Sequence, residues 1–333
     1  MTAALTWGRL GFRQQRWELI LVALGVAATA IAMLWFASQL NGLRAASPGC
    51  VPPAAAEFGS CEAALNAYSQ IEGLADNMLL LSFGAPFGIG VLLGAPLIAR
   101  EIDAGTAQLA WSIGRSRVSW LLRRIAFIAL FVVVALGVLA VTSEILAAAL
   151  APERNLGSDF AWFGRRGWLI VARGLGALML GMLVGALIGR VLPAILAAAL
   201  VMALVFTGLS FAQDRWQEGL TETHRMNYSE AGSYLDSGAL VINTGLELAS
   251  GEVVTWSELN ERGLEVSYVD EQGRLFASEQ DMQDGNLLGY DVEFAIPGAR
   301  YAGVVAAVGA ASVGVGLLAL GLTAVVVGRR RPV

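Results

Sequence analysis

Two ionisable residues interrupt long apolar runs of the sequence, Glu144 in one run and Arg173 in the next. A carboxylate or a guanidinium is costly in an apolar medium unless it is paired or serves a function. Both residues lie at a similar depth from the ends of two consecutive, antiparallel segments. The sequence therefore predicts a structural Glu144–Arg173 ion pair, with a substrate contact as the alternative.

The other reactive side chains are too few for catalysis. All 22 basic residues are arginine, and the chain has one histidine, His224, and two cysteines. Without lysine it can form neither a P-loop nor a Schiff base. One histidine cannot supply a zinc site, and it offers no Ser-His-Asp set. We expect no enzyme activity, metal or cofactor in this chain, so that any energy source is another protein.

The composition indicates a membrane protein. Hydrophobic residues make up 56% of the 333 positions and charged residues 15%, whereas soluble domains are about one quarter charged. Six apolar stretches are long enough to cross about 30 Å of hydrocarbon. The predicted spans are Glu18–Leu40, Asn77–Ala99, Ile125–Leu150, Trp168–Gly189, Val191–Ala212 and Tyr301–Gly328. We expect an all-α polytopic membrane protein with six transmembrane helices.

The arginines predict the orientation of these spans. Twelve arginines lie in the N-terminal segment, the loop 100–124, position 190 and the tail 329–333, whereas the two short loops on the other side hold four. Because cytoplasmic loops are enriched in arginine, both termini are predicted to be cytoplasmic. The segment 213–300, with 17 acidic residues and 5 arginines, is then extracytoplasmic.

Segment 213–300 has the pattern of a small α+β domain between spans 5 and 6. The pieces ALVIN, EVVTW, LEVSYV and RLFA are typical of strands. Residues 267–277 predict a hairpin with its turn at Asp270–Gly273. The piece DRWQEGLTETHRM, directly after the fifth span, favours a helix.

Two further segments flank the first span. Residues 1–17 alternate aromatic and apolar positions with Arg and Gln, which predicts an amphipathic interfacial helix; a plain basic flank is the alternative. The predicted outer loop 41–76 contains Cys50 and Cys61. On an oxidising side of the membrane these favour a structural disulfide, with two free thiols as the alternative.

Glycines spaced four residues apart predict close helix packing in the second and fourth spans. These are Gly84 and Gly88, Gly90 and Gly94, and Gly181, Gly185 and Gly189. Pro86 and Pro96 also predict that the second span is bent or loses regular hydrogen bonds.

The loop 100–124 combines charged residues with apolar positions that suit a helix between Arg100 and Ser112. Gly105-Thr106 interrupts this stretch and can mark a turn or a new helix cap. A cytoplasmic helix anchored at both ends to spans would act as a lever on them. A solvated linker is the alternative.

This loop carries a resemblance to a known family. In AREIDAGTAQLAWSIGRSRVSWLLRR, the pattern of Glu101, Gly105-Thr106, Leu109, Ser116-Arg117 and Trp120 resembles the first cytoplasmic loop of ABC-2 type permeases, in particular the six-span permeases of actinobacterial exporters. TWGRLGFRQQRWELI and LGMLVGALIGRVLPA are similar to their N-terminal region and their fourth-to-fifth turn. YDVEFAIPGARYAG, before the last span, departs from the family pattern.

The resemblance implies a coupling helix that docks on a separate ATP-binding subunit. The residues it nominates for this contact are Glu101, Gly105, Thr106, Gln108, Leu109, Ser116 and Arg117. It also implies a substrate path lined by the second and fifth spans. The path candidates are Phe83, Phe87, Phe206, Thr207 and Phe211, for which ordinary interhelical packing is the alternative.

The function so implied is the permease subunit of an ABC exporter in the bacterial plasma membrane. It would move an amphipathic or hydrophobic drug, peptide or lipid outward, as in multidrug efflux. The implied partners are two copies of an ATPase that binds ATP and Mg, a second permease copy or paralogue, and membrane lipid, with no nucleic acid. The main alternative is a membrane sensor or scaffold with a ligand-binding outer domain. An ion-coupled transporter or intramembrane enzyme has less support, since the spans contain no proton relay.

Overall fold

The computed structural model describes residues 2–52, 61–105, 117–226, 238–263, 266–270 and 273–329, without the side chains of 2–14, 117, 118 and 120. The chain forms two compact units. Unit 1 comprises residues 1–153, 162–208 and 305–333, and unit 2 comprises 154–161 and 209–304. The divisions between them fall inside two long helices, α7 (Val191–Glu218) and α10 (Tyr301–Arg329).

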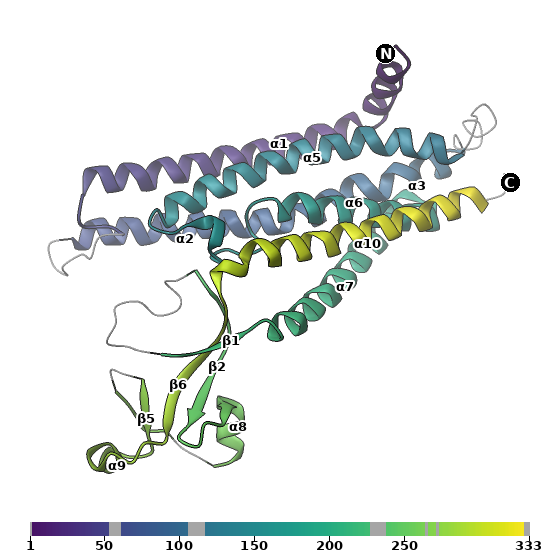
Figure 1. Cartoon of the computed structure of the whole chain (residues 1–333). Coiled ribbons are helices and arrows are strands. Elements are labelled where there is room, and N and C mark those ends of the chain that lie inside the picture. Colours follow the sequence, from purple (N-terminus) through teal and green to yellow (C-terminus); the bar gives the residue numbers. More distant parts are fainter. Residues whose placement is uncertain are drawn as a thin grey trace. The chain divides into compact units, whose positions relative to one another are not determined.

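Long helices build unit 1 (Figure 1). Besides α7 and α10, they are α1 (Thr2–Ala46), α2 (Glu62–Ile89), α3 (Ala95–Asp103), α5 (Arg117–Leu150) and α6 (Leu169–Ile188). A π-helical segment, η1 (Gly90–Gly94), joins α2 to α3, so that these three elements form one continuous span. Within the described residues, six helical segments are long and apolar enough to cross a membrane, which confirms the six predicted spans.

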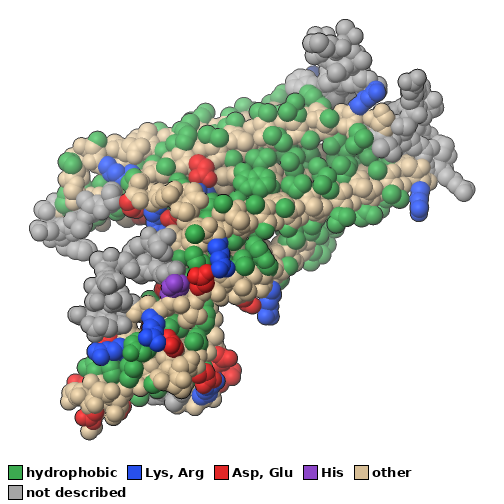
Figure 2. Space-filling view, in the orientation of Figure 1, with side chains coloured by type: hydrophobic (Ala, Val, Ile, Leu, Met, Phe, Trp, Pro, Cys, Tyr) green, Lys and Arg blue, Asp and Glu red, His purple; other side chains and the backbone are tan. Residues whose placement is uncertain are grey.

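Hydrophobic side chains cover much of the visible face of these helices (Figure 2), as expected of a surface that contacts lipid. The N- and C-terminal ends of unit 1 lie at the same end of the helices (Figure 1). We call this end, which carries Arg16, Arg100, Arg124, Arg190 and Arg329, the basic end of unit 1. Leu19, near the start of the first span, and Val327, near the end of α10, belong to one buried cluster.

The helices extend beyond the predicted spans. α1 continues to Ala46 and α2 begins at Glu62, so much of the predicted loop 41–76 is helical. The reason is local, since EAALNAYSQIEGLAD is rich in strong helix formers, and helix propensity does not depend on the apolar character that marked the spans. At the other end of α1, Gln15 has non-helical backbone angles, which separates residues 2–14 from the span by a kink.

Helix α6 is the most buried of the described spans, and glycines let the second span approach it closely. A Cβ atom at Gly90 would lie 2.6 Å from Cβ of Ala177, and one at Gly94 would lie 2.5 Å from the carbonyl oxygen of Leu178. From the α6 side, side chains at Gly181 and Gly185 would overlap the backbone of the second span. These contacts confirm the predicted role of Gly90 and Gly94 and of Gly181 and Gly185, whereas the prediction is wrong for Gly84 and Gly88, where an added Cβ would meet no atom within 4 Å.

The π-helical segment lies within this contact. Pro96 has no N–H to donate to the carbonyl of Leu92, four residues earlier, so the α-helical hydrogen-bond ladder is interrupted there. The wider turn of η1 takes its place, in agreement with the predicted irregularity of this span.

Unit 2 contains an antiparallel sheet. Its strands are β1 (Glu222–Arg225), β2 (Leu240–Leu248), β3 (Val253–Thr255), β4 (Tyr268–Val269), β5 (Arg274–Phe276) and β6 (Gly289–Ile296). The order is β3-β2-β6-β5-β4, and β1 also pairs with β6. Short helices α8 (Trp256–Glu261) and α9 (Glu279–Asp284) and 3-10 turns η2 (Leu156–Ser158) and η4 (Gly298–Arg300) complete the described part of the unit.

The strand predictions hold for β2 to β5, and β4 and β5 form the expected hairpin. The helix predicted across residues 214–226 is wrong beyond Glu218, because 222–225 pair with β6 instead. Strand β6, which contacts β1, β2 and β5, was not predicted. Its sequence alternates apolar and acidic residues from Tyr290 to Phe294, as a half-exposed strand would, but Asp291 and Glu293 are buried.

Glu293 is 3% exposed, and its Oε2 atom has no hydrogen-bond partner among the described residues. Burial, followed by the negative charge of Asp291, raises the pKa of Glu293 above the ordinary value of 4.5, although His224 opposes the shift. Because the folded state then holds this proton more tightly than the unfolded state, unit 2 loses stability as the pH rises from about 4.5 through the raised pKa.

We predict that Glu293→Gln increases the stability of unit 2 at pH 7 and flattens its dependence on pH above 4.5. The measurement is hydrogen exchange of the β6 amides in the detergent-solubilised full chain, corrected for intrinsic rates at each pH. Glu279→Gln, on the short helix α9, is the control and should leave the β6 profile unchanged. Equal pH dependence of β6 amide exchange in the Glu293→Gln variant and the parent would show that Glu293 does not cause it.

We also predict that Gly181→Leu separates the second span from α6, at a cost of about 1–3 kcal/mol or more, as for an overpacked core. The matched control is Gly137→Leu in α5, where an added Cβ meets no atom within 4 Å. Thermal unfolding in detergent should show a lower midpoint for Gly181→Leu alone. Similar midpoints for both variants would show that the contact is not tight.

Candidate functional site

Three aromatic side chains that the sequence nominated for a substrate path lie together in unit 1. Phe83 and Phe87 in α2 have ring centroids 5.7 Å apart, and Phe206 in α7 lies 4.7 Å from Phe87, each in an edge-to-face arrangement. We call these three residues the aromatic row. Phe83 is exposed and the other two are partly buried, so the row forms an accessible surface between two spans.

The positions of the row follow from the helices that carry it. Phe83 and Phe87 are four residues apart and therefore share a face of α2. Phe206 packs against a buried cluster that includes Ala177 and Ala95, where α6 meets the second span. Thr207, the next residue of α7, is exposed, whereas Phe211 belongs to unit 2. Side chains at Gly84 and Gly88 would meet no atom within 4 Å, so the surface beside the row is open.

Arg173 in α6 lies at one end of the aromatic row. Its guanidinium carbon is 5.0 Å from the ring centroid of Phe83, within the range of a cation–π contact. Its Nη1 atom donates a hydrogen bond of 2.7 Å to the carbonyl oxygen of Gly164. Among the described residues, no carboxylate forms an ion pair with it. A buried cation thus adjoins an aromatic surface.

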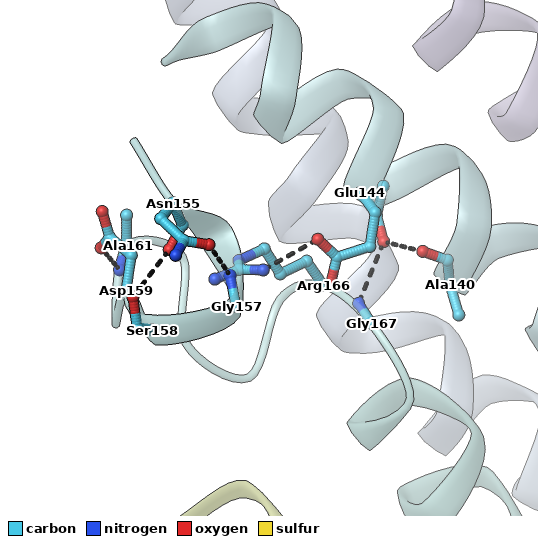
Figure 3. Close-up of polar contacts among 10 residues, drawn as sticks. Ala140, Glu144, Asn155, Gly157, Ser158, Asp159, Ala161, Arg166 and Gly167 are labelled. Atoms are coloured by element: carbon cyan, nitrogen blue, oxygen red, sulfur yellow. Dashed lines mark hydrogen bonds and ion pairs between the residues drawn. The ribbon is translucent and has the colours of Figure 1, made fainter. Parts of the chain in front are cut away.

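The predicted Glu144–Arg173 ion pair is wrong. Glu144 pairs instead with Arg166, whose Nη1 atom lies 2.8 Å from its Oε2 atom (Figure 3). The reason is the direction of helical side chains, which lean toward the N-terminus of their helix. Arg173 therefore reaches back to Gly164 in the preceding connection, and Arg166 from that connection reaches Glu144.

The connection between α5 and α6 makes further contacts with α5 and α2. The N–H of Gly167 donates to Ser143 Oγ at 3.3 Å. The side chains of Trp162 and Arg165 both contact Asp76, at 2.8 and 3.3 Å. The hydroxyl of Ser82 donates to the Arg165 carbonyl. We call residues 162–167 the clamp, because they join three spans at the end of unit 1 opposite the basic end.

Sequence reasoning missed the clamp. Arg165 and Arg166 entered only as charges that indicate orientation, and Asp76 only as a loop boundary. The sequence did contain a signal for it. Two arginines lie in one short connection, and acidic residues lie near the ends of two neighbouring apolar runs. Which arginine meets which acid depends on backbone turns, including the left-handed conformation of Trp162 and Gly164.

At the basic end, two ion pairs link three helices. Glu101 of α3 pairs with Arg124 of α5, and Glu18 of α1 pairs with Arg100 of α3. Glu101 is 6% exposed. This burial argues against the nominated direct contact of Glu101 with an ATPase and indicates that it fixes α3 to α5.

The other nominated coupling residues are mostly outside the described part of the chain. Gly105 follows the end of α3 with a left-handed φ of +67°, which agrees with the predicted turn. Arg117 is the first residue of α5, and its side chain is not described. Thr106, Gln108, Leu109 and Ser116 lie outside the described residues.

Cys50 and Cys61 are joined by a disulfide. The bond connects the segment that follows α1 to the residue that precedes α2. Because the spans on both sides of this loop are covalently tied, their relative movement at this end of unit 1 is restricted.

Unit 2 has a pocket of its own, with a volume of about 470 Å³. Its lining combines Asp270 and Arg274, which form an ion pair, with the rings of Phe276 and Tyr290. Across the described residues, no cluster of three His, Cys, Asp or Glu side chains could hold a metal ion.

One comparison with known proteins gives a match. The family model described as ABC-2 membrane transporter related matches residues 21–213, which is more than half of the chain and includes the aromatic row, the clamp and the segment between α3 and α5. No curated protein matches the chain, and no solved structure does. Most of unit 2 lies beyond the matched residues.

We predict that Glu144 is energetically coupled to Arg166 and not to Arg173. In a double-mutant cycle of thermal stability, Glu144→Gln with Arg166→Gln should show a coupling of about 0.5–3 kcal/mol, as for side chains in contact. Glu144→Gln with Arg173→Gln serves as the control and should be additive within about 0.5 kcal/mol. Coupling of Glu144 with Arg173 and additivity with Arg166 would instead support the ion pair that the sequence predicted.

Proposed function

Because the chain belongs to the ABC-2 membrane transporter related family, we propose that it is the permease subunit of an ABC exporter in a bacterial plasma membrane. In this proposal it moves an amphipathic or hydrophobic substrate outward, and ATP hydrolysis in a separate subunit drives the movement. The observation that carries the proposal is the family match across the first five spans and the segment that joins α3 to α5.

The arrangement of the basic end supports a mechanical role for residues 104–117. The pairs Glu101–Arg124 and Glu18–Arg100 tie the last turn of α3 to α5 and α1. A force on the segment after α3 would therefore move the basic ends of three helices together. We place this end in the cytoplasm because it carries most of the arginines of unit 1.

The absence of lysine from the chain supports a separate energy source. A P-loop needs its lysine on the nucleotide phosphates, so ATP and Mg would bind to a partner subunit. We propose two copies of that subunit, with a second permease, identical or paralogous, completing the transporter.

The aromatic row supports an apolar or amphipathic substrate. Its rings offer stacking and burial to an apolar molecule, and Arg173 adds a cation–π contact at Phe83. Such a surface would hold the apolar part of a drug, peptide or lipid as it passes between α2 and α7.

A membrane sensor is the second candidate, and the pocket of unit 2 is the observation in its favour. In that case a ligand would bind near Arg274 and Tyr290, and the segment after α3 would signal to a partner. The two functions differ in a simple way, since only a permease should stimulate ATP hydrolysis in proportion to substrate.

We predict that Gly105→Trp abolishes stimulation of the partner ATPase while the protein still inserts in the membrane. A bulky side chain at this turn would obstruct docking at the segment after α3. The measurement uses nanodiscs that contain the full chain and the ATP-binding protein that copurifies with it, and we expect at least a tenfold loss of stimulation, equivalent to about 1.4 kcal/mol.

The matched control is Gly49→Trp. Gly49 also has a left-handed φ, +88°, and open space around it, but lies after α1 at the end of unit 1 opposite the basic end. This variant should stimulate the ATPase as the parent does. Equal activity of both variants, or the absence of any ATP-binding protein after copurification, would refute the proposed function.

A further inference from the structure

Arg173 is a cation inside a span. Among the described residues, no carboxylate pairs with its guanidinium. A guanidinium has five N–H donors, and the Gly164 carbonyl accepts from Nη1. The residue is 9% exposed, so bulk water is not its main solvent. An ionised side chain at this depth ordinarily has a counter-charge or a functional role.

The nearby carboxylates are committed to other arginines. Glu144 pairs with Arg166, and Asp76 contacts Arg165. The clamp and Arg173 thus contain three arginines, and the two carboxylates named above contact Arg165 and Arg166. Arg173, which contacts the aromatic row, pairs with neither of them.

We propose that Arg173 and the aromatic row form a binding site for a single-chain amphipathic acid, whose carboxylate or phosphate pairs with the guanidinium. The apolar part of the molecule would lie along Phe83, Phe87 and Phe206. This inference rests on the proposed function and specifies its substrate as an amphipath with an anionic head group.

The geometry of the site suits such a molecule. The guanidinium lies against Gly164, where a Cβ atom would be 2.8 Å from Nη1 and 2.9 Å from Nη2, so the glycine is what allows the guanidinium to take this position. Beyond the guanidinium, the ring centroids of Phe83 and Phe87 are 5.7 Å apart along α2, and those of Phe87 and Phe206 in α7 are 4.7 Å apart. The forked donors of arginine also fit the two oxygens of a carboxylate or phosphate.

The test is photolabelling of the full chain in phosphatidylcholine nanodiscs. The probes are palmitic acid with a diazirine in its chain and the corresponding diazirine-bearing hexadecylamine, and the adducts are mapped by mass spectrometry. We expect the acid to label α2 and α7 beside the aromatic row, and the amine to label them no more than other lipid-facing helices. Equal labelling by both probes would overturn the proposal.

Variants of Arg173 test the role of its charge. Arg173→Gln should reduce labelling by the acid about tenfold, the loss expected for one charge-assisted hydrogen bond. Arg173→Lys should restore at least half of it, which separates a charge effect from misfolding. Unchanged labelling in Arg173→Gln, or no recovery in a folded Arg173→Lys, would contradict the inference.

Arg44 supplies the matched control. It also lies beside an aromatic ring, with its guanidinium carbon 5.9 Å from the Tyr68 centroid, and it donates to the carbonyls of Pro52 and Leu150. Arg44→Gln should leave labelling of α2 and α7 unchanged. A drop equal to that in Arg173→Gln would show a general loss of folded protein and refute a specific site.

A last experiment distinguishes two possible occupants of the site, a free amphipath and the head group of a resident lipid. Replacing one fifth of the lipid by phosphatidylglycerol should leave labelling by the acid in place. Complete loss of labelling would assign the site to membrane lipid and overturn its role in substrate binding. Because no arm requires ATP or a partner, labelling that depends on Arg173 without ATPase stimulation would refute the proposed function and leave this site standing.

Discussion

The close contact between the second span and α6 determines how the rest of unit 1 can be arranged. Gly90 and Gly94 on one side and Gly181 and Gly185 on the other bring two backbones close together. Dispersion and packing drive helix association in a lipid, so a contact of this kind fixes both the distance and the register of the two helices. Phe206 of α7 packs against the buried cluster at this contact and meets Phe87 of α2.

Polar contacts then secure the two ends of the same helices. The clamp holds α2, α5 and the start of α6 at one end, and the pair Glu101–Arg124 holds α3 to α5 at the other. Between them, the second span has a π-helical segment in place of a regular α-helix, and such segments recur at functional sites. A force that enters after α3 would therefore reach the aromatic row through η1, while the clamp and the Cys50–Cys61 disulfide limit movement at the far end.

Much of this arrangement could be predicted from residue spacing. Six apolar runs gave the spans, glycines four residues apart gave the contact with α6, and Phe83 and Phe87 gave one face of the aromatic row. The choice of ion-pair partner could not be predicted, because it depends on how residues 162–167 turn and on which way Arg173 leans. Strand β6 could have been predicted from the alternation of apolar and acidic residues in Tyr290–Phe294, whereas the burial of Asp291 and Glu293 could not, because it depends on the neighbouring strands.

The central claim is that the segment after α3 contacts an ATP-binding subunit, and cross-linking in native membranes tests it most directly. Asp103 is exposed at the end of α3 and accepts a photoreactive residue without disturbing the buried pair of Glu101. The account predicts that irradiation links position 103 to an ATP-binding protein, which mass spectrometry identifies by its P-loop peptide. Adducts with lipid alone, in membranes where that ATP-binding protein is present, would contradict it.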